Sequence, residues 1–136
     1  MGRGDKMPTV KARNLAVLVV EDEFLIADEI AFAFARLGIK TVGPAKTVRR
    51  ARDLIEGDGH LDGAVLDINL RGELVFPLVD LLRERGVPVI FATGYDQASI
   101  PKEYRNIPRH EKPLNYEKIV QTLFPGSRRP SASGVV

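Results

Sequence analysis

The chain has 136 residues, which is enough for one domain with a substantial core and leaves little room for a second. It contains no cysteine, which excludes disulfides, thiolate catalysis and cysteine-ligated metals. The formal net charge of +2 comes from basic residues near both ends, so a folded basic groove for nucleic acid is not indicated. Neither a membrane-spanning apolar run nor a signal-peptide pattern is present, and we expect a cytoplasmic protein without membrane contact.

Both ends lack hydrophobic periodicity and are rich in glycine, proline, serine and arginine. We therefore expect a disordered N-terminal tail over residues 1–13 and a disordered C-terminal tail over residues 126–136. A single folded domain is predicted between them, at residues 14–125.

Strand and helix signals alternate from the start of this domain. Leu15–Val20 is a continuous apolar run, typical of a parallel strand that is covered on both faces. Apolar side chains that recur on one stripe predict a helix over about Glu23–Leu37. Residues 40–43 form a short second strand, and Thr47 is placed to cap a helix that Gly57 ends.

The same alternation continues through the middle of the chain. Gly63–Ile68 is the third predicted strand, and Val87–Thr93 is the fourth. A helix is predicted between them over about Phe76–Arg85, with Pro77 tolerated because it lies in the first turn.

The last part of the chain carries weaker signals. Residues 106–111 are a candidate fifth strand, which we place at a sheet edge because Pro108 cannot donate a ladder hydrogen bond. Asn115 caps a last helix that Pro125 ends. The segment 96–106 has little periodicity and is expected to form a short or mobile helix.

Polar residues stand at the predicted strand ends. Repeated strand–helix units predict a parallel sheet with helices on both faces, and ligands gather at the carboxyl ends of such strands. Glu21 and Asp22 follow the first strand, and Asp67 ends the third. If these strands are neighbours, their carboxylates converge and either raise a pKa or recruit a cation, for which Mg²⁺ suits hard oxygen ligands. For Glu23 we favour a simple position in the first turn of a helix.

These residues, with Thr93-Gly94 after the fourth strand and Lys112-Pro113 after the fifth, resemble the receiver domains of two-component response regulators. The resemblance covers about residues 15–124. It implies an α/β, flavodoxin-like (CheY-like) doubly wound parallel sheet of five strands in the order 2-1-3-4-5. Phe91–Tyr95, with the sequence FATGY, further resembles the FATGUY subgroup of single-domain receivers.

The resemblance also implies roles for the acidic residues. Asp67 would be the phosphoacceptor, which receives a phosphoryl group from a histidine kinase or a phosphotransfer protein. Mg²⁺ would be held by Asp22, Asp67 and the main-chain carbonyl of Asn69, with Glu21 acting through a water molecule. A hydrolase would need a second acid where Asn69 stands, so we expect no enzyme activity beyond slow autodephosphorylation.

The remaining site residues would contact the phosphoryl group. The Lys112 ammonium group would contact one phosphoryl oxygen, and the Thr93 hydroxyl would donate a hydrogen bond to another. Gly94 would leave the aspartate open and offer its N–H, and the family suggests a cis bond between Lys112 and Pro113.

One position departs from the receiver pattern. The aromatic residue that ordinary receivers carry three positions before the lysine is Arg109 here, and Tyr95 is a candidate to replace it. We expect phosphorylation to order the loop 95–106 and so to change a surface for an unknown downstream protein. A non-phosphorylated interaction module and a receiver excised from a hybrid histidine kinase are the alternatives to a stand-alone receiver.

Overall fold

A computed structural model describes residues 15–94 and 100–126 of the chain. Its centre is one sheet of five parallel strands in the predicted order, β2-β1-β3-β4-β5. The predicted tails lie outside the described residues, apart from Gly126. The strands are β1 (Ala16–Val20), β2 (Lys40–Ala45), β3 (Gly63–Asp67), β4 (Val89–Thr93) and β5 (Arg109–Glu111).

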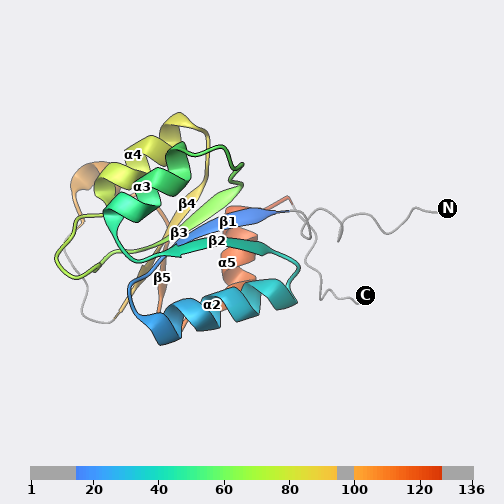
Figure 1. Ribbon diagram of the computed structural model, residues 1–136. Coiled ribbons are helices and arrows are strands. Elements are labelled where there is room, and N and C mark those ends of the chain that lie inside the picture. Colours follow the sequence, from blue (N-terminus) through green and yellow to red (C-terminus); the bar gives the residue numbers. More distant parts are fainter. Residues whose placement is uncertain (1–14, 95–99, 127–136) are drawn as a thin grey trace.

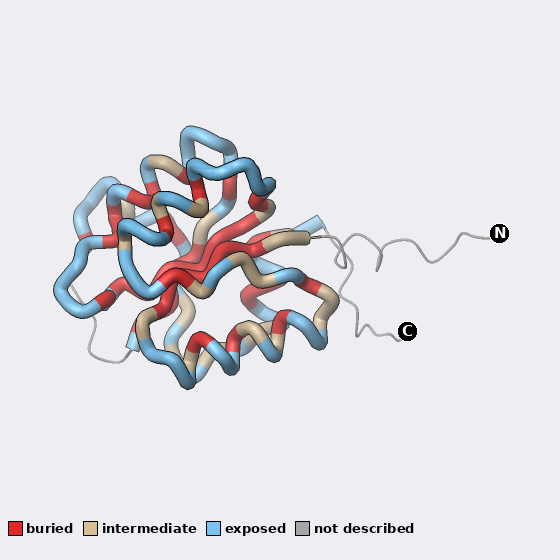
Figure 2. Tube along the Cα trace, viewed as in Figure 1, coloured by how far each residue is buried: buried red, intermediate tan, exposed pale blue. Residues whose placement is uncertain are grey.

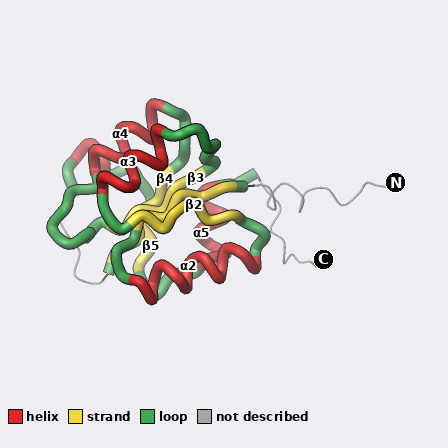
Figure 3. Tube along the Cα trace, viewed as in Figure 1, coloured by secondary structure: helices red, strands yellow, loops and turns green. Residues whose placement is uncertain are grey.

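Helices cover both faces of the sheet. Figure 1 shows α3 and α4 above it and α2 and α5 below it, and Figure 3 shows the same layers by element type. No helix in the described ranges is long and apolar enough to cross a membrane. The helices are α2 (Phe24–Arg36), α3 (Val48–Glu56), α4 (Phe76–Glu84) and α5 (Tyr116–Leu123), with one 3-10 turn, η1 (Lys102–Tyr104).

The apolar run of β1 is buried on both faces because alternate side chains enter different halves of the core. Val17 and Val19 pack with residues of α2 and α5, whereas Leu18 and Val20 pack with residues of α3 and α4. Figure 2 shows the buried residues gathered along the strands between the two layers of helices. This double burial is the reason for a continuous rather than an alternating apolar pattern.

Side-chain caps fix the beginnings of two helices, as predicted. The Thr47 hydroxyl accepts a hydrogen bond from the backbone N–H of Arg50, and the Asn115 side chain accepts one from Lys118. The structure adds a partner from outside α3, since the Glu73 carboxylate accepts the N–H of Val48 at 2.9 Å. That carboxylate places negative charge at the positive end of α3.

Each strand differs from the prediction at one boundary: β1 begins at Ala16 rather than at Leu15, and β4 begins at Val89 rather than at Val87. β2 has six residues rather than the four predicted at 40–43, because one extra residue is accommodated between the pairs Leu18↔Val42 and Val20↔Ala45. Gly43 has a φ of 99°, which an ordinary residue rarely adopts, and pairing with β1 resumes beyond it. β3 ends one residue early, at Asp67, and β5 keeps only residues 109–111 of the predicted strand.

Of the segment 96–106, where a short or mobile helix was predicted, the described residues 100–106 contain the single turn η1. Residues 95–99 lie outside the described part of the chain, so the predicted roles of Tyr95 and of that half of the loop stay predictions. Tyr104 holds η1 against α4, because its hydroxyl donates to the Asp80 carboxylate at 3.1 Å and its ring stacks on Phe76.

Replacement of Thr47 by alanine should lower the free energy of unfolding by about 1 kcal/mol, because the N–H of Arg50 loses its acceptor. Thr47→Ser keeps the hydroxyl and should restore most of that loss. Urea unfolding followed by circular dichroism measures both variants. Equal stability of the alanine variant and the wild type would contradict the capping role.

Candidate functional site

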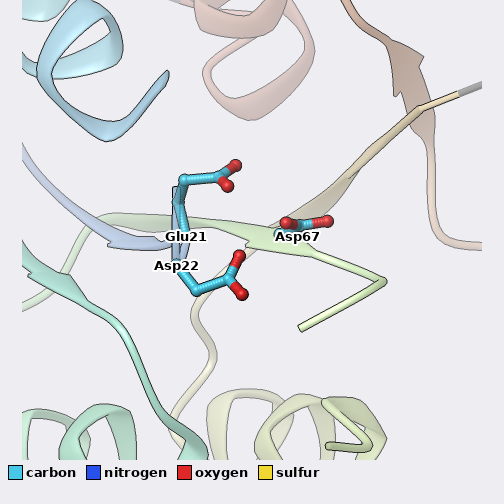
Figure 4. Close-up of side chains that lie close together, drawn as sticks. All are labelled: Glu21, Asp22 and Asp67. Carbon is cyan, nitrogen blue, oxygen red and sulfur yellow. The ribbon is translucent and has the colours of Figure 1, made fainter. Parts of the chain in front are cut away.

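Three carboxylates meet at the carboxyl edge of the sheet. Glu21 and Asp22 follow β1, Asp67 ends β3, and these strands are neighbours as the prediction required. An oxygen atom from each of the three carboxylates lies within 4.8 Å of the others. Figure 4 shows the three side chains reaching one region from the two strands. The predicted convergence of acidic residues is therefore present.

Lys112 brings the opposite charge to this cluster from just beyond β5. Its ammonium nitrogen lies 3.0 Å from Glu21 Oε1 and 3.5 Å from Asp67 Oδ2. Burial alone would lower the pKa of Lys112, but the hydrogen bonds and charges of Glu21 and Asp67 outweigh it and raise that pKa. Lys112 is consequently held in its protonated, positively charged form. The peptide bond between Lys112 and Pro113 is cis, as the family resemblance suggested.

The Asp67 carboxyl group has a raised pKa. Its side chain is nearly fully buried, and this burial together with the negative charge of Glu21 raises its pKa to about 7. Lys112 and the backbone N–H of Asn69, which donates to Asp67 Oδ1 at 3.0 Å, act in the opposite direction. The competition leaves a carboxyl group that changes its protonation state near neutral pH, in a position open to a ligand.

Glu21 differs from the other two acids because both of its carboxylate oxygens already have protein partners. Oε1 accepts from Lys112, and Oε2 accepts from the backbone N–H of Glu23. Glu23 occupies the N-cap position of α2 rather than its first turn, and its side chain makes no capping bond. Glu21 thus ties the lysine to the end of β1.

Thr93 and Gly94 form the wall beside Asp67. The buried Thr93 hydroxyl donates to the carbonyl oxygen of Gly94 at 2.9 Å, so it points to its own main chain in this structure. A Cβ atom built on Gly94 would meet no atom within 4 Å, so packing does not require a glycine at this position. The space beside Asp67 is open instead.

Arg71 is a member of the site that the sequence analysis missed. Its Nε atom lies 2.7 Å from Asp22 Oδ2, and its side chain lines the pocket that also contains Asp67 and Lys112. The available signal was its position four residues after Asp67, beside the turn-forming Gly72. Arginine on a turn is ordinarily solvated, and its sequence position alone does not show which acid it reaches.

The donor set fits a hard divalent cation. The pocket has a volume of about 420 Å³, and the oxygen atoms of Asp22 and Asp67 face it without any sulfur or imidazole ligand among its lining residues. Carboxylate oxygens with room for water molecules suit Mg²⁺. The acidic cluster is therefore compatible with the predicted cofactor.

Five parallel strands in this order, with acids after β1 and β3 and a lysine after β5, define a flavodoxin-like domain with a charged site at its carboxyl edge. No protein-family model matches the chain. The sensory transduction protein LytT from Bacillus subtilis is 34% identical over 113 residues, which are 80% of this chain and 46% of LytT. The chain thus spans about half the length of this curated relative.

Solved structures match over most of their length. SdrG from Sphingomonas melonis Fr1 is 36% identical, with 82% of this chain and 94% of SdrG covered at a TM-score of 0.71. A BeF3-activated conformation of SdrG has also been solved and matches with a TM-score of 0.66. The PhyR response regulator REC domain from Erythrobacter litoralis is 26% identical, with 87% and 95% covered at a TM-score of 0.68.

These likenesses cover 82% of this chain for SdrG and 87% for the PhyR REC domain. The chain belongs to the receiver domains of response regulators and is a receiver of the two-component type.

Replacement of Asp67 by asparagine should stabilise the metal-free protein most at high pH. The folded-state pKa of about 7 lies above the unfolded value of 3.8, so the folded state holds more protons between these pH values. The wild type consequently loses stability as the pH rises from about 4 to about 7, whereas Asp67→Asn does not. The stability gain of the variant should be about 2 kcal/mol larger at pH 8 than at pH 5.

Urea unfolding in EDTA at several pH values measures this difference. Asp53→Asn, at an exposed position of α3, is the matched control and should show no such trend. A stability difference between Asp67→Asn and the wild type that does not change with pH would contradict the raised pKa.

Proposed function

We propose that the chain accepts a phosphoryl group on Asp67 from the phosphohistidine of a histidine kinase or of a phosphotransfer protein. The observation that supports this most is the position of Asp67, a buried carboxylate 3.5 Å from Lys112 at the open edge of the sheet. A buried acid beside Glu21 is costly unless it has a function or a compensating partner, and Lys112 compensates only part of that cost.

The transfer balances without a further reactant. An oxygen of the Asp67 carboxylate attacks the phosphorus atom, a P–O bond forms and the P–N bond to the donor imidazole breaks. The electron pair of the broken bond stays on the imidazole nitrogen, which takes up a proton from solvent water. The product is an acyl phosphate on Asp67 and a neutral histidine on the donor.

The protein's own residues would act on the charge of the transferred group. Lys112 already lies between Glu21 and Asp67, so a phosphoryl oxygen on Asp67 enters the reach of its ammonium group. The Thr93 hydroxyl now donates to Gly94 and would rotate about its Cα–Cβ bond to reach a second oxygen. The open space at Gly94 leaves room for the incoming donor.

Mg²⁺ is the proposed cofactor. Asp22, Asp67 and the main-chain carbonyl of Asn69 would hold it, with Glu21 acting through a water molecule. When bound, the ion supplies positive charge that offsets the negative charge of the phosphoryl group and favours the ionised form of Asp67. SdrG, which is 36% identical to this chain, has a BeF3-activated conformation, and BeF₃⁻ mimics a phosphoryl group in charge and shape.

The proposed signal leaves the domain by protein contact in the cytoplasm. Asn69 supplies no second acid beside Asp67, so the expected self-hydrolysis is slow and the chain acts as a phosphoacceptor rather than an enzyme.

With Arg109 in the place of the receiver aromatic, the loop 95–106 is the proposed element that changes on phosphorylation. Its described part contains η1, which Tyr104 holds to α4. Amide exchange in residues 100–106 that stays unchanged on activation would contradict this route.

Incubation with acetyl phosphate and Mg²⁺ should add one phosphoryl group to the wild type, which intact mass spectrometry measures. Asp67→Asn should abolish the addition, and the exposed α3 control Asp53→Asn should retain it. Phosphotransfer from the host's histidine kinases should show the same dependence. A wild type that stays unmodified under both conditions would favour a receiver-like interaction module that is not phosphorylated.

Thr93 offers a sharper test of the proposed contacts. Thr93→Val keeps the shape of the side chain but removes the hydroxyl, and it should slow phosphorylation by acetyl phosphate by about ten- to a hundredfold. Thr93→Ser keeps the hydroxyl and should stay within a few-fold of the wild type. Equal rates for the valine and serine variants would show that the hydroxyl takes no part.

A further inference from the structure

The Arg71–Asp22 ion pair has no role in the proposed transfer. The Arg71 Nε atom lies 2.7 Å from Asp22 Oδ2, where the acid side chain is 9% exposed and the arginine side chain 78% exposed. Asp22 also belongs to the group of three acids that could hold a metal ion. The Asp22 carboxylate therefore pairs with Arg71 and also belongs to the proposed site for Mg²⁺.

The loop after β3 directs Arg71 to this acid. Arg71 and Gly72 are the central residues of a tight turn, in which the N–H of Glu73 donates to the carbonyl of Leu70 at 3.0 Å. Leu70 is buried in the core, and Glu73 accepts the N–H of Val48 at the start of α3. Both ends of the turn are thus anchored to the fold.

The backbone of Arg71 supports the same conclusion. Its φ of 49° is the one positive value among the non-glycine residues of the described ranges. Such a conformation is unfavourable for a residue with a Cβ atom, and asparagine or glycine would be the easier choice for the turn. The turn alone consequently does not explain an arginine here, whereas the Asp22 carboxylate gives its side chain a partner.

We propose that Arg71 competes with Mg²⁺ for the Asp22 carboxylate and so sets the Mg²⁺ concentration at which the site fills. This inference rests on the proposed function and concerns the regulation of the same site. Arg71 acts through Asp22 and is a positioning residue rather than a catalytic one. In the absence of metal, the positive charge of the Arg71 guanidinium offsets the negative charge of Asp22, and it repels an incoming cation.

The exchange of one cation for the other requires little rearrangement. The Arg71 side chain is mostly exposed, so it can turn into solvent without opening a cavity or leaving a buried charge. The same exposure limits the size of the effect, because water and salt screen the guanidinium. One positive charge several ångströms from a divalent ion in such surroundings should weaken Mg²⁺ binding by about three- to tenfold.

Binding of Mg²⁺ to the full chain, measured by NMR chemical-shift changes without any phosphate donor, tests this inference. Arg71→Asn removes the charge with a residue that adopts positive φ readily, and its Kd for Mg²⁺ should fall about three- to tenfold. Arg71→Lys keeps a charge and should stay closer to the wild type. Arg85→Asn, the same change at the exposed C-terminal end of α4, is the matched control and should leave the Kd unchanged.

The Nε–H signal of Arg71 gives a second readout. It should shift in the wild type as Mg²⁺ saturates the site, because the ion pair with Asp22 is replaced by contact with water. An unchanged or weaker affinity in Arg71→Asn, or a Kd that falls equally in Arg85→Asn, would overturn the competition. These results leave phosphorylation of Asp67 intact, whereas a wild type that neither binds Mg²⁺ nor accepts phosphate contradicts the proposed function itself.

Discussion

Two buried carboxylates that share one ammonium group are the constraint on which this site depends. Glu21 and Asp67 lie at the ends of neighbouring parallel strands, and Lys112 reaches both from beyond the edge strand β5. Burial of Asp67 and, after it, the negative charge of Glu21 disfavour ionisation of Asp67, and Lys112 offsets this only in part, so the pKa of Asp67 is raised to about 7. The site is therefore prepared for added positive charge beside Asp67.

The rest of the fold maintains that arrangement. Double burial of β1 between two layers of helices fixes the strand from which Glu21 and Asp22 emerge. Glu21 uses one oxygen for Lys112 and the other for the backbone of Glu23, so the start of α2 and the segment after β5 meet at the same residue. The loop after β3 carries Arg71 to Asp22. Glu21 and Asp67 thus share Lys112, whereas Asp22 pairs with Arg71, and this separates the role of Asp22 from that of the other two acids.

Much of this could be predicted from sequence because strand ends and helix caps leave local signals. The position of Asp67 after an apolar run and the caps at Thr47 and Asn115 follow from short patterns. The Arg71–Asp22 pair could not be predicted in this way, since it joins two loops through a turn with positive φ. The bond from Glu73 to α3 and the extra residue in β2 were missed for the same reason, because both depend on contacts between distant segments.

The central claim is that the acids of β1 and β3 and the lysine after β5 serve one bound group. A crystal structure of the protein with Mg²⁺ and BeF₃⁻ tests it most directly. The account predicts beryllium on a carboxylate oxygen of Asp67, Mg²⁺ at about 2.1 Å from oxygens of Asp22 and Asp67, and Lys112 in contact with a fluorine atom. An ion bound away from these acids, or a Lys112 that stays with Glu21 while BeF₃⁻ occupies Asp67, would contradict it.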